Sequence, residues 1–194
     1  MNKFFSAVVV AMGMFVAAPS HAILTTYTNN GAFTSQLSPI TQETFNDNTL
    51  EPGLSIVSTY GYIGSNVFND QLITGAQTTR FNFATAINGF AATFDLSPGG
   101  SGAGIQFTLT LLGGATQVLS TQITNNTDGF FGFISSTPFT SVLFTAGTQG
   151  SNVETYNLDN LRFGSVPNAV PEPGSMALLG LGLIGLAMVR RKQA

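Results

Sequence analysis

The sequence has 194 residues, no cysteine, one histidine and a net charge of −3 at pH 7. Because that histidine is His21, the stretch from residue 23 to 169 lacks both His and Cys. This excludes histidine-dependent serine triads, cysteine nucleophiles and the usual zinc, copper or haem ligands from that stretch. Its eight acids and two arginines give a net charge of −6, which argues against nucleic acid as a partner.

Residues 1–22 have the pattern of a secretory signal peptide. A single cation, Lys3, precedes an apolar run over residues 4–18, and the small residues Ser20 and Ala22 form an A-x-A-like cleavage site. We therefore predict a signal helix, export by the Sec machinery and cleavage after Ala22. The alternative is an uncleaved amino-terminal anchor, which the small residues disfavour.

Residues 23–165 are predicted to form one all-β ectodomain. Residues 105–111 alternate apolar side chains with Gln and Thr, which is typical of a half-buried antiparallel strand. Gly113 and Gly114 then predict a hairpin turn before a return strand over 116–124. Other strand candidates are 40–45, 54–63, 80–83, 89–94, 130–134, 140–145 and 156–163. Short strands between Gly, Pro and Asn turns indicate an antiparallel β-sandwich of jelly-roll type.

Phenylalanine is the main candidate for the core. Fourteen of the 17 phenylalanines lie in the ectodomain, and we expect them to fill the space between two sheets. The alternative is that some are exposed as a platform for stacking sugars. The absence of tryptophan weakens that alternative.

The last predicted strand contains an irregularity. Tyr156 and Leu158 share one face, because side chains alternate along a strand. Leu161 and Phe163 have the opposite parity, so one extra residue must be accommodated near Asp159-Asn160. We predict a β-bulge there.

Residues 128–144 and 156–164 resemble the closing strands of jelly rolls of the carbohydrate-binding-module type. In such domains an acid near the first strand and an aspartate near the last hold a structural calcium ion. The resemblance implies Glu43 and Asp159 as ligands here, with Asp47 as a helper, and oxygen ligands suit calcium. The alternative is that Asp159 belongs to a simple turn and Glu43 is a solvated charge.

The end of the chain has three parts after a linker over residues 166–173. Val170, Pro171, Glu172 and Pro173 close the linker. The apolar run 174–189 would span about 24 Å as a helix, a little less than the hydrocarbon core of a bilayer. The basic tail 190–194 begins with the three cations Arg190, Arg191 and Lys192. We predict a transmembrane helix with its basic end in the cytoplasm; the alternative is a buried core helix.

This tail resembles the PEP-CTERM sorting signal of Gram-negative bacteria, in which Val-Pro-Glu-Pro precedes a Gly- and Leu-rich helix and an Arg-rich end. The resemblance implies processing by an exosortase near Pro171–Pro173. It also implies a protein that is tethered to the membrane and then placed at the cell surface or in an exopolysaccharide matrix.

The ectodomain itself is predicted to have a structural or adhesive role without catalysis. The alternative is a calcium-dependent carbohydrate-binding module, and a glycoside hydrolase comes third. The eight acids are scattered singly, and no nucleophile elbow, phosphate-binding loop or zinc-binding H-E-x-x-H motif is present.

Overall fold

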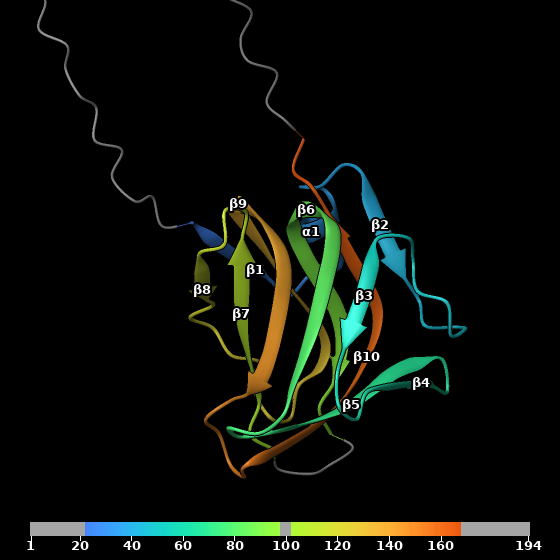
Figure 1. Cartoon of the computed structure of the whole chain (residues 1–194), viewed down its shortest axis with the longest axis vertical. Coiled ribbons are helices and arrows are strands. Elements are labelled where there is room, and N and C mark those ends of the chain that lie inside the picture. The colour runs from blue at the N-terminus through green and yellow to red at the C-terminus, as the bar shows by residue number, and fades with distance from the viewer. Residues whose placement is uncertain (1–21, 98–101, 168–194) are drawn as a thin grey trace, which may run out of the picture.

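The computed structural model describes residues 22–97 and 102–167, which fold as an antiparallel all-β domain with one short helix (Figure 1). The elements are β1 (Leu24–Tyr27), α1 (Asn30–Thr34), β2 (Ile40–Glu43), β3 (Leu54–Val57), β4 (Tyr62–Gly64), β5 (Val67–Ile73), β6 (Thr78–Asp95), β7 (Ile105–Leu111), β8 (Thr116–Val118), β9 (Asp128–Ala146) and β10 (Val153–Gly164).

The strands belong to one hydrogen-bonded sheet with the order β4-β5-β10-β6-β9-β7-β8. In addition, β1 pairs with β9, β2 with β10 and β3 with β6. The long strands β6 and β9 run side by side through the centre of the domain (Figure 1). Their pairing is irregular between Asn82 and Gly89, and these irregularities allow the ribbon to bend.

Because β6 and β9 bend, their two halves form two facing layers. The half of β6 before the bend pairs with β3, and the half after it pairs with β10. Phenylalanines from the two halves meet in the core: the ring centroids of Phe81 and Phe90 are 5.6 Å apart, and those of Phe133 and Phe139 are 5.9 Å apart. The predicted phenylalanine core is confirmed, since 13 of these rings are buried and Phe130 is partly buried.

The structure corrects several of the predicted elements. Residues 80–83 and 89–94 are parts of one strand, as are residues 130–134 and 140–145. The return strand after Gly113-Gly114 is only three residues long. The predicted strand 54–63 is divided into β3 and β4 by a turn in which the Ser58 hydroxyl accepts hydrogen bonds from the Tyr60 and Gly61 N–H groups. The elements β1, α1 and β5 were not predicted. The side chain of Asn29 caps α1 by accepting a hydrogen bond from the Ala32 N–H.

The predicted bulge in β10 is confirmed. Asp159 pairs with Thr93 and Arg162 with Ala91, so three steps along β10 match two along β6. Asn160 has a φ of 51°, a left-handed conformation that asparagine tolerates better than most residues. The extra residue keeps Leu161 and Phe163 on the core side.

Within residues 22–97 and 102–167, no helix is long and apolar enough to cross a membrane. The predicted transmembrane segment 174–189 and most of the signal peptide lie outside this part of the chain.

Candidate functional site

A groove of about 460 Å³ lies over the sheet edge formed by β4, β5 and β10. Two tyrosines stand at this edge with most of their surface exposed, Tyr60 at 54% and Tyr62 at 62%. The other lining residues are Asn69, Asp70, Gln71, Thr155 and Asn157. Aromatic faces beside amides and hydroxyls form a surface suited to a ligand with both apolar faces and polar edges.

The strand register places several of these side chains in a row. Tyr62 pairs with Asn69, Asn69 with Asn157, and Asn157 with Asp95. Directly paired residues point to the same face of a sheet, so the row crosses β4, β5, β10 and β6. With neighbouring strands about 4.8 Å apart, it is about 14 Å long.

The Tyr-Gly-Tyr segment has a glycine for a packing reason. A Cβ on Gly61 would lie 2.5 Å from the Phe68 ring, so any other residue would displace that ring or the segment. The glycine therefore allows the backbone to lie on the buried Phe68, and both flanking tyrosines remain exposed.

A buried polar network supports the groove from below. Tyr156 donates a hydrogen bond from its hydroxyl to Thr79, and Thr79 donates to Asp70, which also accepts from the Gln71 N–H. Burial and the Asp70 charge raise the pKa of Tyr156 well above its ordinary value. The tyrosine therefore stays neutral and holds the network in place.

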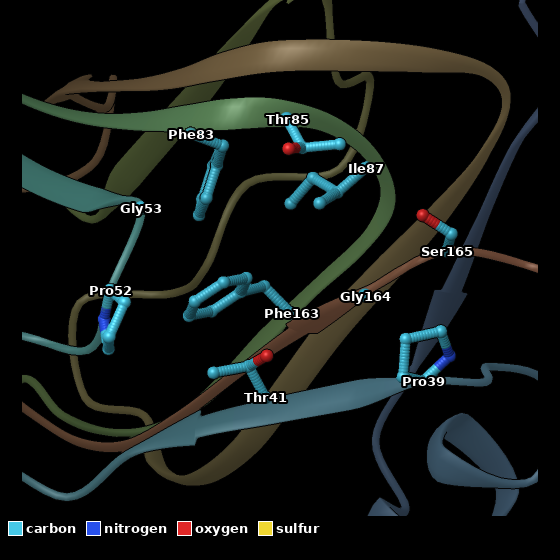
Figure 2. Close-up of a pocket in the computed structure, with 10 residues that line it drawn as sticks. All are labelled: Pro39, Thr41, Pro52, Gly53, Phe83, Thr85, Ile87, Phe163, Gly164 and Ser165. Atoms are coloured by element: carbon cyan, nitrogen blue, oxygen red, sulfur yellow. The ribbon is translucent and has the colours of Figure 1, made fainter.

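A second hollow has a volume of only about 210 Å³ and lies where β2 and β10 approach the bend of β6. Figure 2 shows the rings of Phe83 and Phe163 projecting into it, with Thr41, Thr85 and Ser165 around them. Ligand sites commonly measure about 300–1,000 Å³, so the tyrosine groove is the better candidate.

The acids predicted to bind calcium have other partners in the structure. Both carboxylate oxygens of Glu43 accept backbone hydrogen bonds, from Phe45 and Glu51. Asp47 accepts from the Thr49 N–H, and both oxygens of Asp159 accept from Asn160. Among the residues that the structure describes, no three acidic, His or Cys side chains form a group that could hold a metal ion.

Another carboxyl group, which the sequence analysis did not single out, is fully buried. Glu154 accepts a hydrogen bond from the Gly104 N–H through Oε2, at 2.5 Å. Its Oε1 has no partner among the described residues. Burial raises the pKa of Glu154 to about 7, although hydrogen bonds from Gly104 and Thr155 oppose the shift.

Ala22, the residue before the predicted cleavage point, is buried at 5% exposure. The other predicted processing and sorting residues, Val170–Pro173 and Arg190–Lys192, lie outside the described residues. The tyrosine groove was not predicted from the sequence. Two tyrosines at positions i and i+2 were the available signal, and the partners on β5 and β10 are brought there only by the sheet order.

Solved structures of family 29 carbohydrate-binding modules are similar to this chain. One point mutant shares 12% sequence identity at a TM-score of 0.46, over 70% of this chain and 99% of the module. Another, in complex with mannohexaose, shares 11% identity at a TM-score of 0.46, over 66% and 92%. No curated protein matches the sequence.

The end of the chain gives a specific match. Residues 169–192 match the family model described as the PEP-CTERM protein-sorting motif. The matched range contains Val170–Pro173, the apolar run 174–189 and the three following cations. The prediction of a PEP-CTERM sorting motif at the end of this chain is confirmed.

Proposed function

We propose that the protein is exported, tethered to the membrane by residues 174–189 and processed by an exosortase near Pro171–Pro173. The observation that supports this is the motif match over residues 169–192. The two prolines favour an extended backbone that a protease can bind without unwinding a helix. The protein then resides at the cell surface or in the extracellular matrix.

Peptide mapping of the protein isolated from its native surface tests this part of the proposal. We expect an amino terminus at Ile23 and a new carboxyl terminus near Pro171–Pro173. A chain that still ends at Ala194 would show a plain membrane anchor and would contradict exosortase processing.

We further propose that the ectodomain is adhesive and binds a polysaccharide in the tyrosine groove. The observation that supports this is the pair of exposed tyrosines beside Asn69, Gln71 and Asn157. Tyrosine faces stack on the apolar faces of sugar rings. Amide side chains both donate hydrogen bonds to hydroxyl groups and accept hydrogen bonds from them. The row of about 14 Å offers contacts to more than one sugar ring.

Charge favours a neutral polysaccharide. The ectodomain carries a net charge of −6, and the row of paired residues ends at Asp95. A polyanion would be repelled by this surface. We therefore expect neutral glucans or mannans to bind more tightly than uronic-acid polymers.

Binding of neutral oligosaccharides to Tyr62 variants tests the groove. Tyr62→Ala removes the stacking face, and we expect an affinity loss of about tenfold, since an aromatic contact contributes roughly 1 kcal/mol or more. Tyr62→Phe keeps the ring and is the matched control, for which we expect at most a small loss. Equal binding by wild type and Tyr62→Ala would contradict the groove and would favour a purely structural ectodomain.

Catalysis is not part of the proposal. A glycosidase needs two carboxyl groups on either side of the scissile bond, and the one acid lining the groove, Asp70, is hydrogen-bonded to Thr79 and Gln71. We expect no release of reducing sugar from any polysaccharide that binds.

We expect glycan binding in this groove to be independent of calcium, because the groove and the predicted ligands Glu43, Asp47 and Asp159 involve different residues. Calcium binding by these acids stays a separate proposal. If Glu43 and Asp159 hold the ion, calcium should raise the melting temperature relative to EDTA, and Asp159→Asn should abolish that rise. No difference between calcium and EDTA would contradict it.

A further inference from the structure

The start of the folded domain is held by two side chains from distant strands. The Ile23 N–H donates to Ser136 Oγ at 2.9 Å, and the Ser136 N–H donates back to the Ile23 carbonyl at 2.9 Å. On the other side of the same peptide group, Gln117 Nε2 donates to the Ala22 carbonyl at 2.7 Å. The Ala22–Ile23 peptide bond is therefore fixed from both sides.

This fixed bond is the one that signal cleavage would break. Ala22 is 5% exposed and packs against the main core. A protease needs an extended, accessible substrate, so the folded domain protects the bond. Cleavage after Ala22 must therefore take place before β1 (Leu24–Tyr27) pairs with β9.

Gln117 contains an acceptor atom that has no partner in the described part of the uncleaved chain. This atom is Oε1, and it is buried. A buried polar atom without a partner costs about 1–3 kcal/mol. The unused acceptor lies on the same amide group that contacts Ala22.

Hydrolysis changes the chemistry at this point. Water adds its hydroxyl to the Ala22 carbonyl carbon and a proton to the Ile23 nitrogen, and the C–N bond breaks. Ala22 leaves with the signal peptide as a carboxylate, and the Ile23 amine takes up a further proton to become an α-ammonium group. A single amide donor is replaced by three charged donors, while the carbonyl that Gln117 contacted is gone.

We propose that Ser136 and Gln117 form a binding site for the α-ammonium group of Ile23, which signal cleavage creates. Ser136 Oγ keeps its hydrogen bond to the nitrogen. The Gln117 amide turns its oxygen into the space that Ala22 vacates and accepts a second, charge-assisted bond. In the processed chain the site holds the start of β1 against β9 through a charged group that the uncleaved chain lacks. This inference rests on the proposed export and signal removal.

Gln117→Glu distinguishes the processed from the uncleaved chain, because we expect it to raise the melting temperature of the first and lower that of the second. In the processed chain the new carboxylate meets an ammonium group, and we expect the melting temperature to rise by about 2–4 °C. In the uncleaved chain the same carboxylate faces the Ala22 carbonyl, and we expect a fall of similar size. The uncleaved chain is obtained with Ser20→Phe, which blocks the cleavage site and changes no residue of the binding site. Both chains are purified in the same detergent with the carboxyl-terminal tail through Ala194 still attached.

A second measurement does not depend on how Gln117→Glu folds. No lysine lies between Ile23 and Ala169, so the Ile23 amine is the one primary amine of a chain processed at both ends. We expect acylation of this amine to be severalfold faster in Ser136→Ala than in wild type, as read by peptide mass.

Three results would overturn the inference. These are a fall in melting temperature with Gln117→Glu in both chains, an acylation rate that Ser136→Ala does not change, and a mature amino terminus other than Ile23. None of them affects the carboxyl-terminal processing, which peptide mapping of the other end tests separately.

Discussion

At the scale of single residues, Glu154 couples the stability of the fold to pH. Its pKa is about 7 in the folded chain because burial disfavours the charged form, against 4.5 ordinarily. The folded state therefore keeps a proton that the unfolded state releases, and the free energy of unfolding falls as pH rises from about 4.5 to 7. Below about pH 4.5 the Glu154 side chain is protonated in both states, and its stabilising contribution is fully present.

Glu154→Gln tests this coupling, because the amide has a similar shape and does not titrate. We expect wild type to lose on the order of 2 kcal/mol across the window and Glu154→Gln to lose markedly less, as measured by urea unfolding at several pH values. Asp128→Asn removes an exposed carboxyl and controls for the change in net charge. A parallel pH profile for wild type and Glu154→Gln would contradict the role of Glu154.

At the scale of elements, the bulge in β10 gives a prediction about deletions. Without Asn160, residues 156–163 would alternate regularly, and Leu161 and Phe163 would stay on the core face. Deletion of Asn160 should therefore keep the fold and lower the melting temperature by only a few degrees. The deletion removes the hydrogen bond from Gln42 to the Asn160 side chain, the one from Arg162 to the Asn160 carbonyl, and the two that Asn160 donates to Asp159.

Deletion of Asn157 from the regular part of the same strand is the matched control. It would turn one half of β10 over and expose either Tyr156 or the buried residues that follow, so we expect loss of cooperative unfolding by circular dichroism. Equal tolerance of the two deletions would show that the strand register is not fixed by the core.

The bulge also shows what the sequence could predict at this scale. Alternation is local, so a change of parity over eight residues was enough to find it. The length of β6 and β9 was not predictable in this way, because residues 83–88 and 135–138 break the alternation. The second of these ranges also contains Pro138. The ribbon continues there because partners far apart in sequence supply its bonds, as when the Leu112 N–H donates to the Pro138 carbonyl.

At the scale of the whole molecule, features that are contiguous in the sequence were again predictable, and features that depend on contacts between distant strands were not. The sorting tail was found because its Pro-Glu-Pro, apolar and basic parts follow one another in the chain, and the family match confirms it. The tyrosine groove depends on strands β4, β5 and β10 meeting at one edge, which no local pattern records. The sorting tail and the tyrosine groove involve different residues. A substitution in the tail should therefore leave glycan binding unchanged, and a substitution in the groove should leave processing unchanged.

A variant with Pro171→Ala and Pro173→Ala tests this separation. Loss of both prolines removes the extended segment proposed for exosortase recognition, so we expect the chain to keep Arg190–Lys192, as read by peptide mapping, and to remain in the membrane fraction. Its affinity for neutral oligosaccharides should stay within about twofold of wild type, because Tyr60 and Tyr62 are unchanged. Tyr62→Ala should give the reverse pattern, with normal processing and weak binding. If either variant changed both properties, the sorting tail and the groove would have to act as one unit.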